Sequence, residues 1–277
     1  MSNLQTRIIS AVILAIAVLA ITWYGGWPFR VLSAVICMAI FFEWAAMAAK
    51  DEAPGWAEGG LGVVPQLLVL VFALGLFVSP PVELLMVMGA AGTALLALLS
   101  AWRGRSQWLA GGFAYAALSG LSISLLRVGG TAGLYAILFL FAVVWATDIL
   151  AYFVGRAVGG PKLAPSISPG KTRSGAAGGT IAGLVAGLVV AYAVGAPNIA
   201  LLGTAALILS IVSQAGDLFE SWVKRRHGVK DSGWIIPGHG GVMDRVDGLV
   251  AAALALYIVG SIAARNAEAP ALGLFAG

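Results

Sequence analysis

The residues whose types suit chemistry are concentrated between Gln214 and Gly248. This stretch holds five of the twelve acidic residues of the chain, both of its histidines and five of its sixteen Lys and Arg residues. The rest of the chain is mostly apolar. Because ionisable groups are costly in an apolar protein, their concentration in one stretch indicates a function.

The first part of this stretch has helical spacing. Asp217, Glu220, Ser221 and Lys224 stand at positions i, i+3, i+4 and i+7. If the helix that precedes them continues, these side chains share one face. We therefore expect a helix that extends beyond its apolar part and carries carboxylates and a lysine at that end.

The second part brings two carboxylates to the start of the last apolar segment. Asp244 and Asp247 stand three residues apart, behind Gly240 and Gly241. Two carboxylates at this spacing repel each other unless a cation lies between them or one of them is protonated. Mg²⁺ prefers oxygen ligands, and a divalent ion among basic residues is typical of phosphoryl or nucleotidyl transfer. The structural alternative is an ordinary network of salt bridges at a membrane surface.

A second polar segment, residues 156–175, contains Ser168, Lys171 and Thr172. Its Gly-Lys-Thr sequence resembles the end of a P-loop, but the glycine that this motif requires at position 165 is a proline, and we expect no preceding β-strand. A lysine, an arginine and hydroxyl groups beside a helix N-terminus still favour phosphate binding over a simple positively charged loop.

Two acidic residues lie within apolar segments. Asp148 forms a polar stripe with Thr147 and Tyr152, which indicates either chemistry or a hydrogen bond between helices. Glu43 lies near a helix end, and we expect an interfacial or structural role for it. His227 is expected to be a solvated loop residue.

The composition identifies an integral membrane protein. The chain has 277 residues, of which 60% are hydrophobic and 10% charged, whereas a soluble domain has about 25% charged residues. In that setting a net charge of +4 does not indicate nucleic-acid binding. With about 20 apolar residues per span, we predict an all-α, polytopic protein with about nine transmembrane helices, at 7–25, 31–49, 61–79, 82–102, 108–126, 134–155, 176–196, 199–223 and 241–264.

Charge distribution predicts the orientation. With the N-terminus inside, every Lys and Arg except Arg30, Arg127 and Arg265 falls on the cytoplasmic side, as the positive-inside rule requires. Both polar segments then face the cytoplasm. We expect five spans in residues 1–132 and four catalytic spans in 133–277, within one integrated membrane domain. A row of glycines at 179, 183 and 187 predicts close helix packing.

The spacing of charged and glycine residues from Ser221 to Asp247 resembles the signature of phosphatidate cytidylyltransferases, also called CDP-diacylglycerol synthases. Segments 148–156 and 168–172 also resemble family segments, so the similarity covers roughly residues 134–260. Many relatives have a second lysine where Gly170 stands and a glutamate where Ser174 stands, so no role is carried over to these two positions.

The resemblance implies that CTP and phosphatidic acid react to give CDP-diacylglycerol and pyrophosphate with Mg²⁺ bound, in a bacterial inner membrane with the site facing the cytoplasm. A second cation and a homodimer are left open. It implies a catalytic set, a metal-binding set and a substrate-binding set. Ser168, Lys171 and Thr172 suit either the lipid phosphate or the triphosphate, and His239 suits phosphate or an aspartate. The catalytic residues are Asp217, Lys224, Asp244, Arg245 and Asp247; the metal ligands are Asp148, Asp217, Asp244 and Asp247; the substrate-binding residues are Ser168, Lys171, Thr172, Ser221, Arg225, Lys230, Asp231, His239, Gly240 and Gly241.

Two other functions fit parts of the pattern. An ion-coupled transporter also has intramembrane carboxylates, but it often has interrupted helices in both halves, whereas the candidate catalytic and metal-binding residues here lie in the second half. A CDP-alcohol phosphotransferase has an Asp-Gly pair followed closely by Ala-Arg and two further aspartates. Here only apolar residues follow Asp247-Gly248 as far as Ser261.

Overall fold

The computed structural model describes residues 3–49, 61–235 and 240–276, and helices form at all of the predicted spans. Seven helices in this described part are long and apolar enough to cross a membrane. The helix near residue 70 has 15 residues, so the predicted count of nine spans is not confirmed. The helices are α1 Asn3–Tyr24, α2 Gly26–Ala48, α4 Val64–Val78, α5 Val82–Trp102, α6 Trp108–Leu126, α7 Thr131–Val158, α8 Arg173–Ala193, α9 Ile199–Arg226, α10 Met243–Ala264 and the short α11 Leu272–Phe275.

The chain divides into two compact units. Unit 1 contains residues 1–124 and 226–245, and unit 2 contains residues 125–225 and 246–277. Helix α10 therefore begins in unit 1 and continues in unit 2. The predicted division near residue 132, within one integrated membrane domain, remains a prediction.

In unit 1, aromatic side chains join α2 to α6. The Trp44 indole nitrogen donates to the backbone carbonyl of Trp108 over 2.8 Å, and its ring lies 5.5 Å from that of Tyr115. A Cβ on Gly112 would lie 2.3 Å from the Trp44 ring, so only glycine leaves room for this contact. The aromatic contacts fix α2 firmly against α6.

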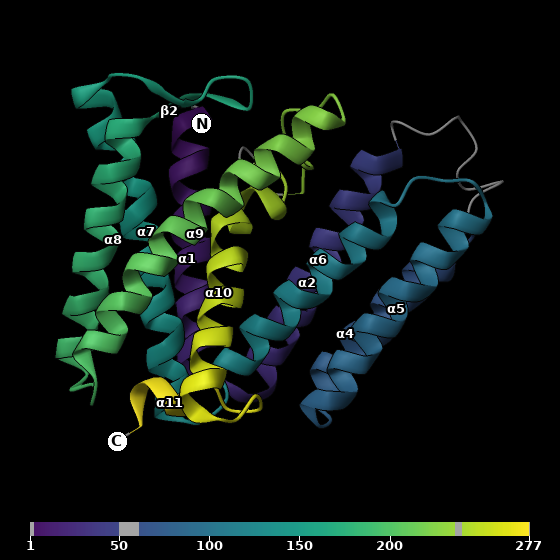
Figure 1. Ribbon diagram of the computed structural model, residues 1–277, viewed down its shortest axis with the longest axis horizontal. Coiled ribbons are helices and arrows are strands. Elements are labelled where there is room, and N and C mark those ends of the chain that lie inside the picture. The colour runs from purple at the N-terminus through teal and green to yellow at the C-terminus, as the bar shows by residue number, and fades with distance from the viewer. Residues whose placement is uncertain (1–2, 50–60, 236–239, 277) are drawn as a thin grey trace. The chain divides into compact units, whose positions relative to one another are not determined.

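In unit 2, a row of glycines allows α8 to pack closely against α7 and α9. A Cβ on Gly179 would lie 2.7 Å from the carbonyl oxygen of Thr147, and one on Gly187 would lie 2.5 Å from Ala206. The predicted role of these glycines in helix packing is confirmed. The Thr147 and Ser210 hydroxyls, 2.7 Å apart, add a hydrogen bond between α7 and α9. Figure 1 shows α7 and α8 side by side.

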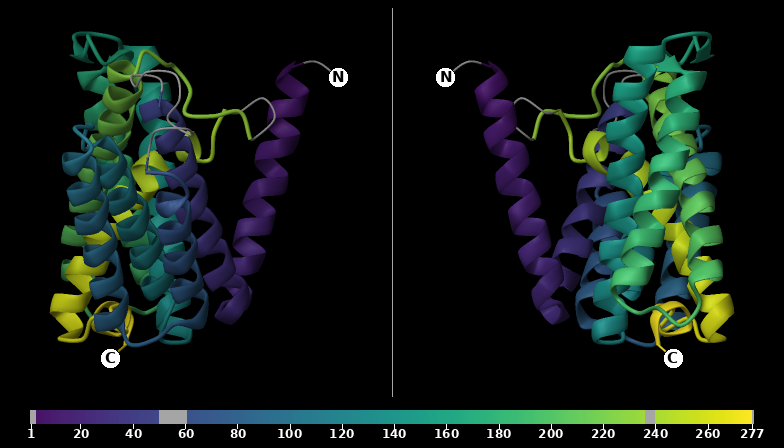
Figure 2. Two further views of the ribbon diagram at one scale, coloured as in Figure 1. Left: turned by 90° about the vertical axis from the view of Figure 1, so that its right-hand side faces the viewer. Right: turned by 90° about the vertical axis from the view of Figure 1, so that its left-hand side faces the viewer.

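A small hairpin interrupts the all-α architecture in unit 2. Strand β1, Lys162–Ala164, pairs antiparallel with β2, Ser168–Thr172, and β2 leads directly into α8. Both views of Figure 2 show the hairpin at one end of α7 and α8. The expectation that no strand precedes the Gly-Lys-Thr sequence was therefore wrong, although Pro165 still departs from a P-loop.

Candidate functional site

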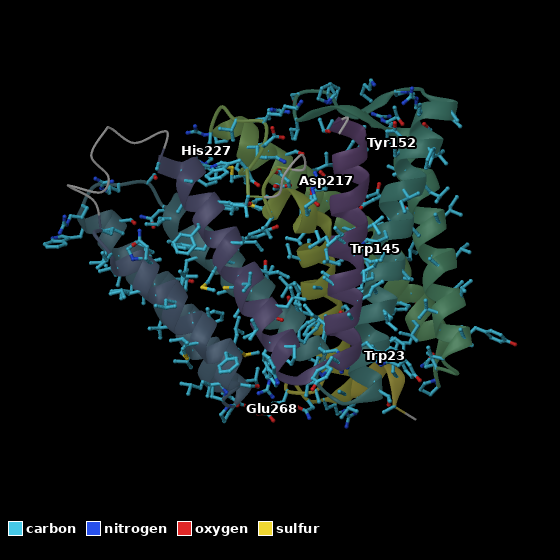
Figure 3. The ribbon with its side chains drawn as sticks, turned by 180° about the vertical axis from the view of Figure 1, so that it is seen from behind. Trp23, Trp145, Tyr152, Asp217, His227 and Glu268 are labelled. Carbon is cyan, nitrogen blue, oxygen red and sulfur yellow. The ribbon has the colours of Figure 1, made fainter. Side chains whose placement is uncertain are left out.

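A cavity of about 620 Å³ lies in unit 2, at the end of α7 and α8 that carries the hairpin. Tyr152 and Asp217 lie toward this end in Figure 3. The Arg156 guanidinium donates to the Tyr152 hydroxyl over 2.9 Å. Side chains from α7, the hairpin and α9 converge on this cavity, which is large enough for part of a substrate. Its polar and charged lining residues are Asp148, Tyr152, Arg156, Lys162, Lys171, Thr172, Gln214 and Asp217.

Carboxylates and a lysine meet at this cavity. Lys171 on β2 forms an ion pair with Asp217 on α9, and both side chains are about 30% exposed. Asp148 lies close enough to Asp217, Asp247 and Lys171 to interact electrostatically with all three. Three of the four predicted metal ligands thus lie within electrostatic range of Asp148, and two of them, Asp148 and Asp217, line the cavity with a predicted substrate-binding lysine.

Two glycines explain why Asp217 and Asp247 are neighbours. A Cβ on Gly216 would lie 2.5 Å from the Ala251 side chain, and one on Gly248 would lie 2.8 Å from the carbonyl oxygen of Ser213. Helices α9 and α10 can therefore approach closely within unit 2. Each glycine is adjacent to one of the two aspartates, so the contact places both carboxylates where the helices meet.

The extension of α9 was predicted correctly. The four polar side chains predicted to share one face form two separate pairs, Asp217 with Ser221 and Glu220 with Lys224. The helix continues to Arg226. The Ser221 hydroxyl lies 3.4 Å from an Asp217 oxygen. Lys224 instead forms an ion pair of 3.3 Å with Glu220, whose side chain is fully buried. Lys224 is therefore tied to Glu220 and is not among the residues that line the cavity.

The hydroxyl of Thr172 has a structural task. Its oxygen accepts a hydrogen bond from the Gly175 backbone N–H over 3.1 Å, which caps the N-terminus of α8. Thr172 is buried, whereas Ser168 on the same strand is half-buried. Of the three hairpin residues predicted to bind phosphate, Lys171 is therefore the one that forms an ion pair with a predicted catalytic residue, Asp217, at the cavity.

The glycine-rich segment before α10, of which the structure describes residues 232–235 and 240–242, belongs to unit 1. Asp244 forms hydrogen bonds with its backbone. The Asp244 Oδ2 atom accepts hydrogen bonds from the backbone N–H groups of Ser232, at 2.9 Å, and Gly241, at 2.8 Å. Gly240 has a φ of +82°, a conformation that suits glycine. Asp244 thus stabilises the backbone that leads into α10. Its spacing from Asp247 did not indicate this role.

The remaining predicted residues lie at the surface or outside the described part of the chain. Arg225, Lys230, Asp231 and Arg245 are exposed. His239 lies outside the described residues. The expectation for His227 was wrong, because its side chain is 3% exposed and its ring packs edge-on against Trp108 with centroids 4.7 Å apart. A neighbouring aromatic residue, distant in sequence, buries the histidine.

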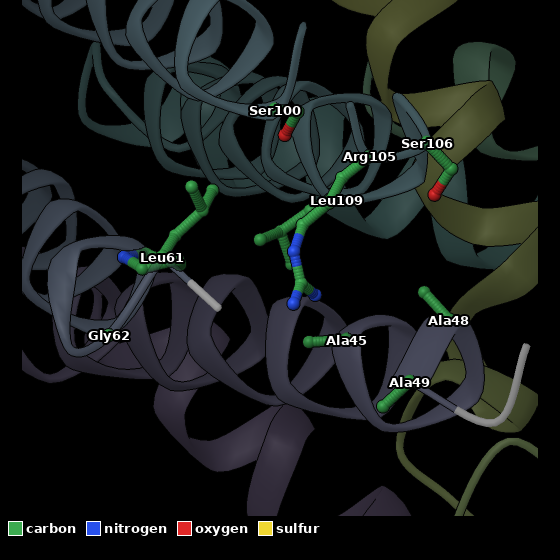
Figure 4. A pocket seen from close by; sticks show the side chains of 10 residues that line it. Ala45, Ala48, Ala49, Leu61, Gly62, Ser100, Arg105, Ser106 and Leu109 are labelled. Atoms are coloured by element: carbon green, nitrogen blue, oxygen red, sulfur yellow. The ribbon is translucent and has the colours of Figure 1, made fainter. Parts of the chain in front are cut away.

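A second pocket, in unit 1, is too small to bind a substrate. It has a volume of about 20 Å³, which is room for about one water molecule. Figure 4 shows the Arg105 side chain extending into it among alanine and leucine side chains. The cavity beside Lys171 and Asp217 is therefore the better candidate for the functional site.

The carboxylates beside the cavity have the ligand chemistry that Mg²⁺ prefers. Among the residues described, no three Asp, Glu, His or Cys side chains converge as a bound metal ion requires. Asp148, Asp217 and Asp247 nevertheless supply only carboxylate oxygens and interact with one another, and hard oxygen ligands suit Mg²⁺. Lys171 provides the positive charge beside Asp217 in this structure.

Two residues that line the cavity were missed by the sequence analysis. Arg156 and Lys162 line the cavity, but their sequence positions indicated only a cytoplasmic loop. Glu43 on α2 is 4% exposed and accepts hydrogen bonds from the backbone at the start of α10. These contacts agree with the structural role expected for Glu43.

Comparison with known proteins gives consistent matches along the chain. A model of the cytidylyltransferase family matches residues 5–263. Phosphatidate cytidylyltransferases of Brucella abortus and Brucella suis are 49% identical over 271 residues, which cover 95% of each chain. A phosphatidate cytidylyltransferase of Staphylococcus haemolyticus is 43% identical over 116 residues, or 42% of this chain and 45% of the relative.

Proposed function

We infer the reaction from the family, because this chain belongs to the cytidylyltransferase family. It is a membrane enzyme that transfers the CMP group of CTP to phosphatidic acid, which gives CDP-diacylglycerol and pyrophosphate. The observation in the structure that best supports this reaction is the meeting of Lys171, Asp217 and Asp148 at a cavity of about 620 Å³. Basic groups there suit phosphates, and carboxylates suit the cation that accompanies a nucleotide.

The chemistry requires alignment and charge neutralisation more than a strong base. A phosphate oxygen of phosphatidic acid is already anionic and forms a bond to the α-phosphorus of CTP. The bond from that phosphorus to the oxygen bridging to the β-phosphate breaks, and pyrophosphate leaves with the electron pair. The protein must therefore hold two anionic substrates in line and offset their mutual repulsion.

The proposed division of roles follows the contacts at the cavity. Lys171, with Arg156 and Lys162 at the same cavity, would bind phosphate oxygens. Asp148, Asp217 and Asp247 would hold Mg²⁺, which when bound neutralises phosphate charge. In unit 1, the exposed Arg245 is also proposed to bind a phosphate group. Both substrates remain candidates for the hairpin residues Ser168 and Lys171.

A direct assay tests this function. Purified protein with CTP labelled in the α-phosphate, phosphatidic acid and Mg²⁺ is expected to give label that extracts with the lipid. Omission of phosphatidic acid should abolish it. An ion-coupled transporter would leave the label in water, and a CDP-alcohol phosphotransferase would consume CDP-diacylglycerol and form none. Absence of label in the lipid, with folded protein, would contradict the proposal.

We also propose that the cavity faces the cytoplasm of a bacterial inner membrane, because the segments around it are rich in Lys and Arg. With Cys37, which is fully buried, replaced by serine, Lys162→Cys and Ala193→Cys place single exposed thiols near opposite ends of α8. An impermeant maleimide is expected to label Ala193→Cys in right-side-out vesicles and Lys162→Cys in inside-out vesicles. The reverse pattern would contradict this orientation.

Lys171→Ala is expected to lower kcat/KM by roughly 10- to 100-fold, because one charged hydrogen-bond donor at the cavity is lost. The matched control is Arg173→Ala, since Arg173 is exposed, lies two residues away and does not line the cavity. Steady-state kinetics with CTP and phosphatidic acid varied separately would measure both variants. Equal effects of the two substitutions would show that Lys171 contributes only to the general charge of the surface.

A further inference from the structure

Helix α2 reaches the start of α10 through Glu43. One carboxylate oxygen of Glu43 accepts a hydrogen bond from the Val242 backbone N–H over 2.7 Å, and the other accepts from Met243 over 2.8 Å. Met243 is the first residue of α10. Glu43 thus binds N–H groups that no preceding turn of helix can satisfy, and its charge suits the positive end of the helix dipole.

Glu43 and Asp244 share a third partner. The Ser232 hydroxyl lies 2.8 Å from the Glu43 Oε2 atom and 2.9 Å from the Asp244 Oδ2 atom. A serine hydroxyl has one proton to donate, so the two carboxylates compete for it or share it. Because Asp244 Oδ2 also accepts from two backbone N–H groups of the same segment, a movement of Glu43 must disturb the surroundings of Asp244.

The glycine-rich segment packs closely around the Glu43 carboxylate. A Cβ on Gly241 would lie 2.3 Å from the Glu43 Oε2 atom and 2.2 Å from the Ser232 hydroxyl oxygen. A Cβ on Gly233 would lie 2.9 Å from the Glu43 Oε1 atom. Glycine at these two positions is what allows the backbone to close on the carboxylate, so the arrangement has little freedom to adjust.

Glu43 is itself held on a rigid support. The next residue, Trp44, is 2% exposed and is fixed to α6 by its hydrogen bond to the Trp108 carbonyl. Phe41, two residues before Glu43, packs edge-on against Phe113 with ring centroids 6.0 Å apart. The contacts therefore run from α6 to α2 and from Glu43 to the segment that carries Asp244.

We propose that Glu43 is a positioning residue of the transferase, which fixes the start of α10 and thereby the directions of Asp244 and Arg245. The early helices α2 and α6 then act as the support of the glycine-rich segment. This inference rests on the proposed function, because Asp244 and Arg245 belong to the catalytic residues that the family resemblance predicts for that reaction. The competing explanation is that Glu43 caps α10 for stability alone.

The primary test is Glu43→Gln, which keeps the size of the side chain but replaces one acceptor oxygen with an NH₂ group facing a backbone N–H. We expect kcat per folded molecule to fall by roughly 10- to 100-fold, as when a supporting hydrogen bond to an active-site group is removed. KM for phosphatidic acid should change by less than about twofold. The control, Glu83→Gln, removes an exposed carboxylate from the first turn of α5 and should leave kcat unchanged.

Ser232→Ala is the second variant, because it removes only the shared hydroxyl. We expect it to lower kcat by about tenfold, and the double variant to be no slower than Glu43→Gln alone, since both substitutions act through one network. A lower melting temperature with unchanged kcat per folded molecule in Glu43→Gln would overturn the proposal. If Glu43→Gln does not fold, an unchanged kcat in Ser232→Ala overturns it instead.

The activity of the wild-type protein distinguishes the proposed function from the positioning role of Glu43. A folded wild type that forms no CDP-diacylglycerol would contradict the proposed function, and the positioning role would fall with it. An active wild type whose Glu43 and Ser232 variants keep the same kcat would contradict only the positioning role. A reduced kcat in both variants, with the Glu83→Gln control unaffected, supports it.

Discussion

Asp217→Asn is expected to lower kcat for CDP-diacylglycerol formation by about 1,000-fold or more, while the protein still inserts and folds. Asparagine keeps the shape of the side chain and removes the charge that faces Lys171 at the cavity. The same charge interacts with Asp148 and Asp247, the other proposed ligands of Mg²⁺. Loss of a group that acts as part of a catalytic unit commonly costs this much.

Two measurements check this expectation. Turnover per folded molecule gives the catalytic effect, and the shift in melting temperature on addition of Mg²⁺ reports binding without any activity. The variant should lose most of the shift that the wild type has. Glu268→Gln, which removes an exposed carboxylate from the same unit, is the control. Near-normal turnover with a normal Mg²⁺ shift would exclude Asp217 from the metal site.

Asp244→Asn is expected to lower kcat by roughly 100- to 1,000-fold, with a smaller change in stability. The asparagine carbonyl oxygen can still accept hydrogen bonds from the Ser232 and Gly241 backbone N–H groups, so the loop before α10 should persist. What is lost is the negative charge in the first turn of α10, beside Arg245. The variant therefore separates the charge of Asp244 from its effect on the loop.

The comparison variant for Asp244 is Gly241→Ala, which keeps the charge and disturbs the loop. A Cβ there would collide with Ser232 and Glu43, so this variant should lose both activity and thermal stability. Circular dichroism and melting curves in detergent, together with turnover, would measure both. If Asp244→Asn keeps normal turnover, Asp244 serves only to hold the loop.

Much of the architecture could be predicted from the sequence because a bilayer leaves few alternatives. Backbone groups in lipid must be satisfied within each segment, so long apolar stretches become helices, and the observed ends of α5 and α6 coincide with the predicted ones. The spacing from Asp217 to Lys224 predicted the extension of α9, which the structure confirms. The glycine row at 179–187 predicted close packing because only small residues let helix backbones approach.

The sequence did not indicate which polar groups meet. Asp148 and Thr147 belong to one stripe, yet Thr147 bonds to Ser210 whereas Asp148 lines the cavity. Asp244 and Asp247 have the spacing of a metal pair, yet Asp244 holds a loop. Glu43 contacts Val242, which is 199 positions away in the sequence. Helical periodicity specifies the face on which a side chain lies, whereas its partner depends on which other helix packs there, and only the tertiary structure determines that.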